Sequence, residues 1–230
     1  MTGPARPRIL AIDTATRASA VAVGTSLDAI DATDVREARH RHGNVLLEQI
    51  DDVLSTAGVS LDGIGAVAVG TGPGSFTGMR VGLATAKTVA HVRQLPIVGV
   101  PSASALRAAA VRGHGAPADI AVVLPAGAHD HYLALPGEDV RLVPPGELVS
   151  MLDGRPVLSL DMPPDVLGDE AAAAGAVALD GLAAALLGLA ADRLAAGETD
   201  ELEALVPAYV ALPRGVSQAA EDLGWSPDLQ

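Results

Sequence analysis

Apolar and polar positions in the first half of the chain predict a mixed sheet with crossover helices. Apolar runs of strand length lie at residues 8–13, 18–24, 29–38, 64–69 and 96–100. Helical spacing of apolar residues marks 42–57, 77–92 and 101–111. The order of three strands, then helix, strand, helix, strand and helix is typical of a hairpin-first sheet whose later strands run parallel.

A run of glycine and proline at 113–117 breaks this pattern and predicts a domain boundary. Beyond it, the pattern predicts strands at 120–124, 131–135 and 156–160, and helices at 145–152 and 182–196. Asp180 is expected to cap the last helix, and Gly197 follows its end. The chain therefore divides into residues 1–112, a smaller part at 113–213 and a polar tail at 214–230, which is expected to be mobile or extended.

The composition and net charge of the chain argue against several classes of function. Of the 230 residues, 49% are hydrophobic and 19% charged, which indicates a globular protein, and the absence of cysteine excludes disulfides and cysteine metal sites. The net charge of −13 argues against strong binding to a nucleic acid backbone. The first eight residues have no apolar core, and the longest apolar run, 182–191, is too short to span a bilayer. We expect a cytoplasmic protein with no membrane contact.

The glycine-rich stretch at 70–82 is the main candidate for chemistry. A buried strand runs into it, and a helix begins near Thr77. Such a loop can cradle phosphate, or it can be a tight strand-to-helix turn packed against another chain. It matches neither the P-loop nor the dinucleotide-binding fingerprint. Candidate nucleotide or phosphate contacts are Asp13, Thr14, Thr16, Gly72, Gly74 and Ser75. Asp13 can orient Mg²⁺-bound water, or it can cap a turn.

Small residues recur every four positions on the helix that follows the glycine loop. They are Gly78, Gly82, Ala86 and Ala90. This spacing leaves a groove that lets another helix approach closely. The second helix can be the segment 42–57, through Leu46 and Ile50, or it can belong to another subunit. These six residues are the predicted partner interface.

The sequence offers no convincing catalytic or metal-binding group. His40 and His42, and His129 and His131, are spaced two apart, but two imidazoles without a third ligand make a weak zinc site, and surface positions are expected. Neither a nucleophile elbow nor a zinc-protease helix motif is present. No metal site is expected.

Several segments together resemble the TsaB family, also called YeaZ. They are Ile9–Thr16, Gly72–Leu83, Ala86–Lys87, Val98–Ser102 and Pro207–Val210. The match is strong from residue 8 to about residue 106 and patchy afterwards. The resemblance implies an α/β fold of two ribonuclease-H-like subdomains, each a mixed sheet flanked by helices. This is the fold of the superfamily of actin, sugar kinases and chaperone ATPases.

The resemblance also implies a function in making threonylcarbamoyladenosine beside the tRNA anticodon. TsaB pairs with the catalytic paralogue TsaD, and the ATPase TsaE joins them. The chain is thus expected to be a non-catalytic scaffold or activator, with no intrinsic cofactor, that can form a homodimer when TsaD is absent. The metal-binding His-x-x-x-His of TsaD has no counterpart at 100–106, and the family pattern Asp-Ala-Arg is missing from Pro125–Tyr132.

A different class of function stays open at this point. The chain can be a weak nucleotide-binding ATPase that uses Asp13 and the Gly72–Gly78 loop, with ATP or ADP and Mg²⁺. A third hypothesis is a nucleotide site that only the partner completes.

Overall fold

The first sheet has the predicted hairpin-first topology. The computed structural model describes residues 6–37 and 42–210, apart from the side chains of 42–44 and 114. Its first elements are β1 (Ile9–Asp13), β2 (Ala18–Ser26), β3 (Ala29–Glu37), α1 (His42–Thr56), β4 (Ala66–Gly70), α2 (Phe76–Arg93), β5 (Ile97–Val100) and α3 (Ser102–His114). The strand order is β3-β2-β1-β4-β5, in which β1–β2 and β2–β3 pair antiparallel and β1–β4 and β4–β5 pair parallel.

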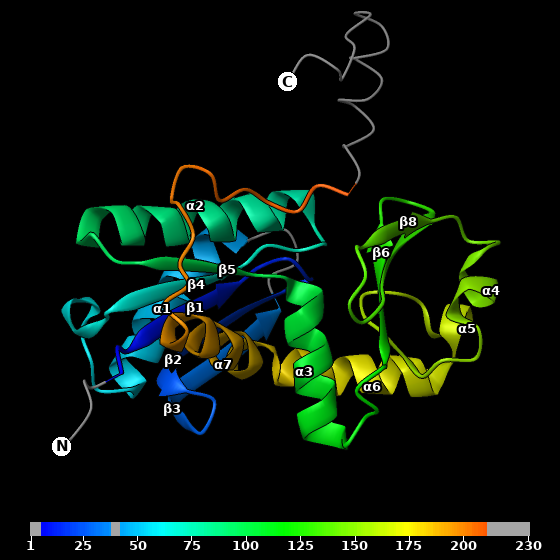
Figure 1. Ribbon diagram of the computed structural model, residues 1–230, viewed down its shortest axis with the longest axis horizontal. Coiled ribbons are helices and arrows are strands. Elements are labelled where there is room, and N and C mark those ends of the chain that lie inside the picture. Colours follow the sequence, from blue (N-terminus) through cyan, green and yellow to red (C-terminus); the bar gives the residue numbers. More distant parts are fainter. Residues whose placement is uncertain (1–5, 38–41, 211–230) are drawn as a thin grey trace, which may run out of the picture.

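The second sheet repeats this arrangement with one strand fewer. Its elements are β6 (Ala121–Ala126), β7 (Asp130–Ala134), β8 (Arg141–Val143), α4 (Leu148–Leu152), β9 (Val157–Ser159), α5 (Pro164–Leu167), α6 (Asp169–Asp180) and α7 (Leu182–Ala195). The order β8-β7-β6-β9 has two antiparallel pairs and then one parallel pair, as in β3-β2-β1-β4. Two mixed sheets flanked by helices confirm the predicted fold class (Figure 1).

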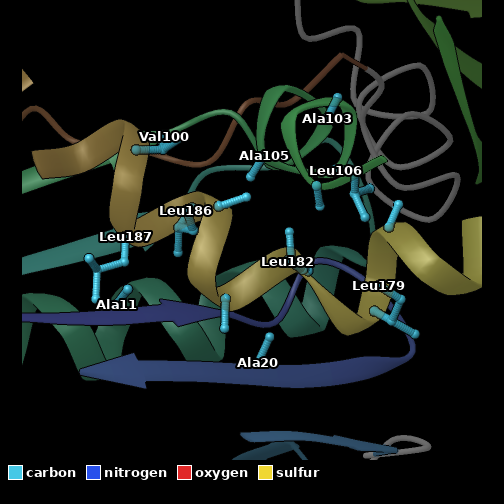
Figure 2. Close-up of a cluster of buried hydrophobic side chains, with 14 of the residues drawn as sticks. Ala11, Ala20, Val100, Ala103, Ala105, Leu106, Leu179, Leu182, Leu186 and Leu187 are labelled. Carbon is cyan, nitrogen blue, oxygen red and sulfur yellow. The ribbon is translucent and has the colours of Figure 1, made fainter. Parts of the chain in front are cut away.

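The two faces of the first sheet are built from residues of different size. Toward α1 and α2, the central strands present Leu10, Ile12, Val21 and Val23. Toward α7, they present mainly alanines, such as Ala11 and Ala20, which lets Leu182, Leu186 and Leu187 approach the strands closely (Figure 2). The same buried cluster continues through α3 and α6 to β6 and β9. One apolar core therefore joins the two sheets.

Several boundaries differ from the sequence prediction. Strand β8 and helices α5 and α6 were not expected. Asp180 does not cap α7: it is the last residue of α6, and Gly181 takes the cap position without a side-chain hydrogen bond. The division at residue 112 stays a prediction, and α7, from the second part, packs on β1 and β2. The tail at 214–230 lies outside the described residues.

No helix within 6–37 and 42–210 is by itself long and apolar enough to cross a membrane. Only α6 and α7 taken together, bent by 61°, meet that length and composition.

Candidate functional site

Asp13 joins three segments of the chain at the end of β1. Its side chain is fully buried. The Ala15 N–H donates to Asp13 Oδ1 at 2.8 Å, and the Ser102 hydroxyl donates to Asp13 Oδ2 at 2.5 Å. Ser102 Oγ in turn accepts the Gly72 N–H at 3.0 Å. The carboxyl group thus ties the end of β1 to the glycine loop and to the first residue of α3.

Burial raises the pKa of Asp13, and the hydrogen bonds from Ser102 and Ala15 act in the opposite direction. Space around the carboxyl group is also filled. A Cβ atom on Gly70 would lie 1.8 Å from Asp13 Oδ2 and 2.8 Å from Ser102 Oγ. Because the bond to the N–H two residues ahead is that of a turn-capping Asp, this geometry favours the structural interpretation over the metal-orienting one.

The two threonines of the β1–β2 turn point inward as well. Both are buried. Thr14 Oγ1 donates to the carbonyl of Gly78 at 2.7 Å, and Thr16 Oγ1 accepts the Ala18 N–H at 3.2 Å. Their hydroxyl groups are therefore used within the chain rather than offered to a ligand.

The glycine loop packs directly on this turn. A Cβ on Gly74 would lie 2.0 Å from the Ala15 carbonyl oxygen, and a Cβ on Gly78 would lie 2.0 Å from that of Thr14. The Ser75 N–H donates to the same Ala15 oxygen at 2.7 Å. The glycines are thus required because the chain's own backbone approaches them, so this is a structural turn that packs within the chain, where the sequence had suggested packing against another chain.

The remaining loop residues have local roles. Ser75 is exposed, and its Oγ accepts the Gly78 N–H at 3.1 Å as the cap of α2. Gly72 has φ = 99°, and a Cβ there would lie 2.2 Å from the Met79 sulfur. The structure therefore brings all six predicted nucleotide contacts together, but as a self-packed turn.

The six residues predicted as a partner interface lie within the chain's own packing. Leu46 and Ile50 belong to the core beneath α1 and α2. The small residues of α2 are buried, and a Cβ on Gly82 would lie 2.2 Å from Thr14 Oγ1. The inner faces of these helices are therefore used within the chain. On their outer faces, Leu47 is 65% exposed and Val92 is 70% exposed.

Sequence reasoning missed a C-terminal strap, residues 198–210, which lies along α2 in Figure 1. Lys87 Nζ donates to the carbonyl oxygens of Glu203 and Leu205 at 3.4 and 3.2 Å. The Ala208 N–H donates to the Thr71 carbonyl at 2.8 Å. In the sequence, only the family resemblance at Pro207–Val210 pointed to this segment, and it did not indicate where the segment packs.

The strap also protects the free edge of the first sheet. Asp200 Oδ2 accepts the Gly99 N–H at 2.7 Å, and Arg193 Nη1 donates to the Gly99 carbonyl at 2.7 Å. The Asp200 N–H donates to the Ile97 carbonyl at 2.9 Å. These bonds use backbone groups of β5 that would otherwise face solvent.

A pair of charged residues connects the β1–β2 turn to the second sheet. The Arg17 N–H donates to Asp161 Oδ2 at 2.6 Å, and Arg17 Nε lies 3.3 Å from Asp161 Oδ1. Burial raises the pKa of Asp161, and the Arg17 hydrogen bond and charge lower it. Because Asp161 follows β9, this contact bridges the two sheets at the strand ends.

The divergent segment Pro125–Tyr132 forms the β6–β7 hairpin, with Leu124 opposite Tyr132 and Pro125 opposite His131. His129 is exposed, as expected, but His131 is buried, which corrects the expectation of a surface position. Its place in a central strand of the second sheet explains the burial. His40 and the side chain of His42 lie outside the described residues. No group of three or more metal-ligating side chains occurs in the part of the chain that the structure describes.

An open hollow of about 680 Å³ lies elsewhere, beside the starts of β6 and β9. It is lined by Arg155, Glu170 and mostly small or apolar residues. None of the predicted site residues lines it.

Comparisons with known proteins match this chain to relatives named TsaD and TsaB and to an uncharacterized protein. The model for "TsaD: tRNA N6-adenosine threonylcarbamoyltransferase" matches residues 35–144. The tRNA threonylcarbamoyladenosine biosynthesis protein TsaB of Escherichia coli is 39% identical over 50% of this chain and 49% of its own length. An uncharacterized protein of Mycobacterium tuberculosis is 30% identical over 68% of this chain and 72% of its own.

Solved structures extend the match over most of the chain. The structure of YeaZ from Pseudomonas aeruginosa is 26% identical, with a TM-score of 0.68, and covers 88% of this chain and 99% of that one. By contrast, the sequence matches to the TsaB proteins of E. coli and Haemophilus influenzae span about half the length of those curated relatives.

Proposed function

The chain belongs to the TsaB family, also called YeaZ, and from this premise we propose that it is a non-catalytic subunit in the synthesis of threonylcarbamoyladenosine in tRNA. In this proposal it pairs with the catalytic paralogue TsaD, and the ATPase TsaE joins the pair. It supports the partner's active site by docking and supplies no reacting group.

The packing of the glycine loop is the observation that carries this proposal. Asp13 has both carboxylate oxygens bonded within the chain, and Gly74 and Gly78 are pressed against the β1–β2 turn. A phosphate would have to displace that turn before it could reach the loop amides. This argues against the alternative of an ATPase that uses Asp13 and the Gly72–Gly78 loop.

The outer faces of α1 and α2 supply the docking surface in this proposal. Leu47 is a large apolar side chain in solvent, and Ala84, Thr88 and Val92 form an exposed row on α2. Small residues in such a row allow a partner helix to come near the α2 backbone, which increases dispersion contacts. The proposal therefore keeps both predicted helices as the docking surface, but it assigns the contact with the partner to their outer residues instead of the predicted inner ones.

The test is complex formation with purified TsaD from the same organism, followed by size-exclusion chromatography with light scattering. We expect a stable heterodimer with the wild-type chain and its loss with Leu47→Glu, because a carboxylate would be buried in an apolar contact. Leu142→Glu is the matched control, since Leu142 is a 42% exposed leucine on β8, in the other sheet. No complex with the wild-type chain, or equal complexes with both variants, contradicts this proposal.

The function itself is tested by nucleoside analysis of tRNA. Depletion of the chain in its host should lower threonylcarbamoyladenosine, and Asp13→Asn should restore it, because the proposal gives Asp13 no chemical step. ATP turnover by the purified chain that disappears in Asp13→Asn would instead favour the ATPase.

A further inference from the structure

At the start of α2, the Arg80 guanidinium lies over the Phe76 ring, which in turn contacts the Tyr209 ring, and we call these three side chains a stack. The Phe76 and Tyr209 rings lie 5.4 Å apart between centroids, tilted by 37°. The Arg80 guanidinium carbon lies 5.2 Å from the Phe76 ring centroid, within the range of a cation–π contact. Tyr209 comes from the strap, so α2 and the strap build this stack together.

Within the described residues, Arg80 differs from most other arginines in having no carboxylate or carbonyl partner. Others pair inside the chain: Arg8 with Asp31, Arg93 with Asp62 and Arg112 with Asp28. In a chain of net charge −13, an exposed cation that no acidic side chain within residues 6–37 and 42–210 neutralises is available to an external anion.

The position of Arg80 suggests what that anion belongs to. Arg80, Ala84, Thr88 and Val92 are four residues apart and all exposed, so Arg80 begins the outer row of α2. A protein that packs along this row therefore also contacts the stack, which lies at the N-terminal end of the row. Tyr209, 43% exposed, adds an aromatic surface beside Phe76, and Tyr and Arg are among the residue types that most often dominate binding energies.

A nucleic acid fits this place less well. Recognition of a nucleic acid backbone needs several cations, and the stack contains only one, Arg80. The single lysine of the chain, Lys87, donates to carbonyl oxygens of the strap.

We propose that the Arg80–Phe76–Tyr209 stack is a pre-organised anchor for a carboxylate of the partner protein that docks on the outer row of α2. This inference rests on the function proposed above and specifies one contact within it. The Phe76 ring restricts the guanidinium before binding, so less side-chain freedom is lost on contact.

The experiment measures binding of the full chain to purified TsaD at several salt concentrations. We expect Arg80→Ala and Arg80→Gln to weaken binding by about tenfold or more and to reduce its salt dependence. Tyr209→Ala should weaken it less, since the cation stays. Arg155→Ala is the matched control, because Arg155 is also exposed and has no ion-pair partner in the part of the chain that the structure describes, but lies in the other sheet's half.

The outcomes separate the two proposals. If the wild-type chain does not bind TsaD, the proposed function fails and this inference fails with it. If the wild-type chain binds and the Arg80 variants bind equally well, the anchor is refuted while the proposed function stands. Unchanged TsaD binding together with lost binding of an anticodon stem-loop RNA would assign Arg80 to nucleic acid and overturn the inference.

Discussion

Replacing Asp13 tests whether its carboxyl group is a structural tie or a reactive group. In Asp13→Ala, the Ala15 N–H and the Ser102 hydroxyl both lose their acceptor in a fully buried site. Each buried donor left unpaired costs about 1–3 kcal/mol, so we expect the two donors together to cost about 2–6 kcal/mol in the free energy of unfolding. For a chain of this size, at about 2–4 °C per kcal/mol, that lowers the melting temperature by about 4–24 °C.

Asp13→Asn separates charge from shape. Its carbonyl oxygen can still accept the Ala15 N–H, but its amide can only donate to Ser102 Oγ, so the buried Ser102 hydroxyl loses its acceptor and stability at neutral pH should fall by about 1–3 kcal/mol, less than in Asp13→Ala. Burial raises the pKa of Asp13 in the folded state above the ordinary value of 3.8. The wild-type chain therefore loses stability relative to Asp13→Asn as the pH rises from about 4 through the folded-state pKa.

The assay is thermal unfolding followed by circular dichroism between pH 4 and pH 8. Asp51→Ala, an exposed aspartate on α1, is the control and should melt within about 1 °C of wild type. If Asp13→Ala melts within about 2 °C of wild type at pH 7, the three-segment tie does not stabilise the fold and the reasoning is refuted.

Three further substitutions test the packing. Gly82→Ala places a Cβ 2.2 Å from Thr14 Oγ1 and should cost about 1–3 kcal/mol by thermal unfolding, whereas Gly146→Ala, with no atom within 4 Å, should be close to neutral. Asp200→Ala removes the acceptor of the Gly99 N–H, so hydrogen exchange of that amide should become faster, and an unchanged rate would contradict the edge-protecting role. Lys87→Met removes the bonds to Glu203 and Leu205 and should increase proteolytic cleavage within 198–210 without lowering the melting temperature by more than about 2 °C.

The first sheet could be predicted from the sequence because its signals are local. Burial on both faces produced the continuous apolar run of β1, and Gly58 marked the end of the α1 segment. Helix α6 was missed because alanines dominate it and give little contrast between its faces, although Ala171, Ala178 and Leu179 are buried. Alternation over three residues was likewise too short to reveal β8.

The candidate site could be located from the sequence, but its role could not be read. A glycine that makes room for a phosphate and a glycine that makes room for one of the chain's own carbonyl groups look the same in the sequence, since both positions require that the Cβ be absent. The distinction depends on Ala15, which lies about sixty residues before Gly74 and approaches it only in the folded chain. Likewise, the contact of Phe76 with Tyr209 joins distant segments that share no pattern.

The repeated topology of the second sheet strengthens the argument against an independent nucleotide site. A ligand held between two such sheets would take polar groups from the ends of the equivalent strands β1 and β6. The first ends at Asp13, which is buried and fully bonded within the chain. The second ends at Ala126, which has no polar side-chain atom. Arg17 and Asp161 then bridge the two halves and neutralise each other. Contacts within the chain therefore hold this junction together. In our proposal the partner protein docks elsewhere, along α2, at Arg80 and the exposed row.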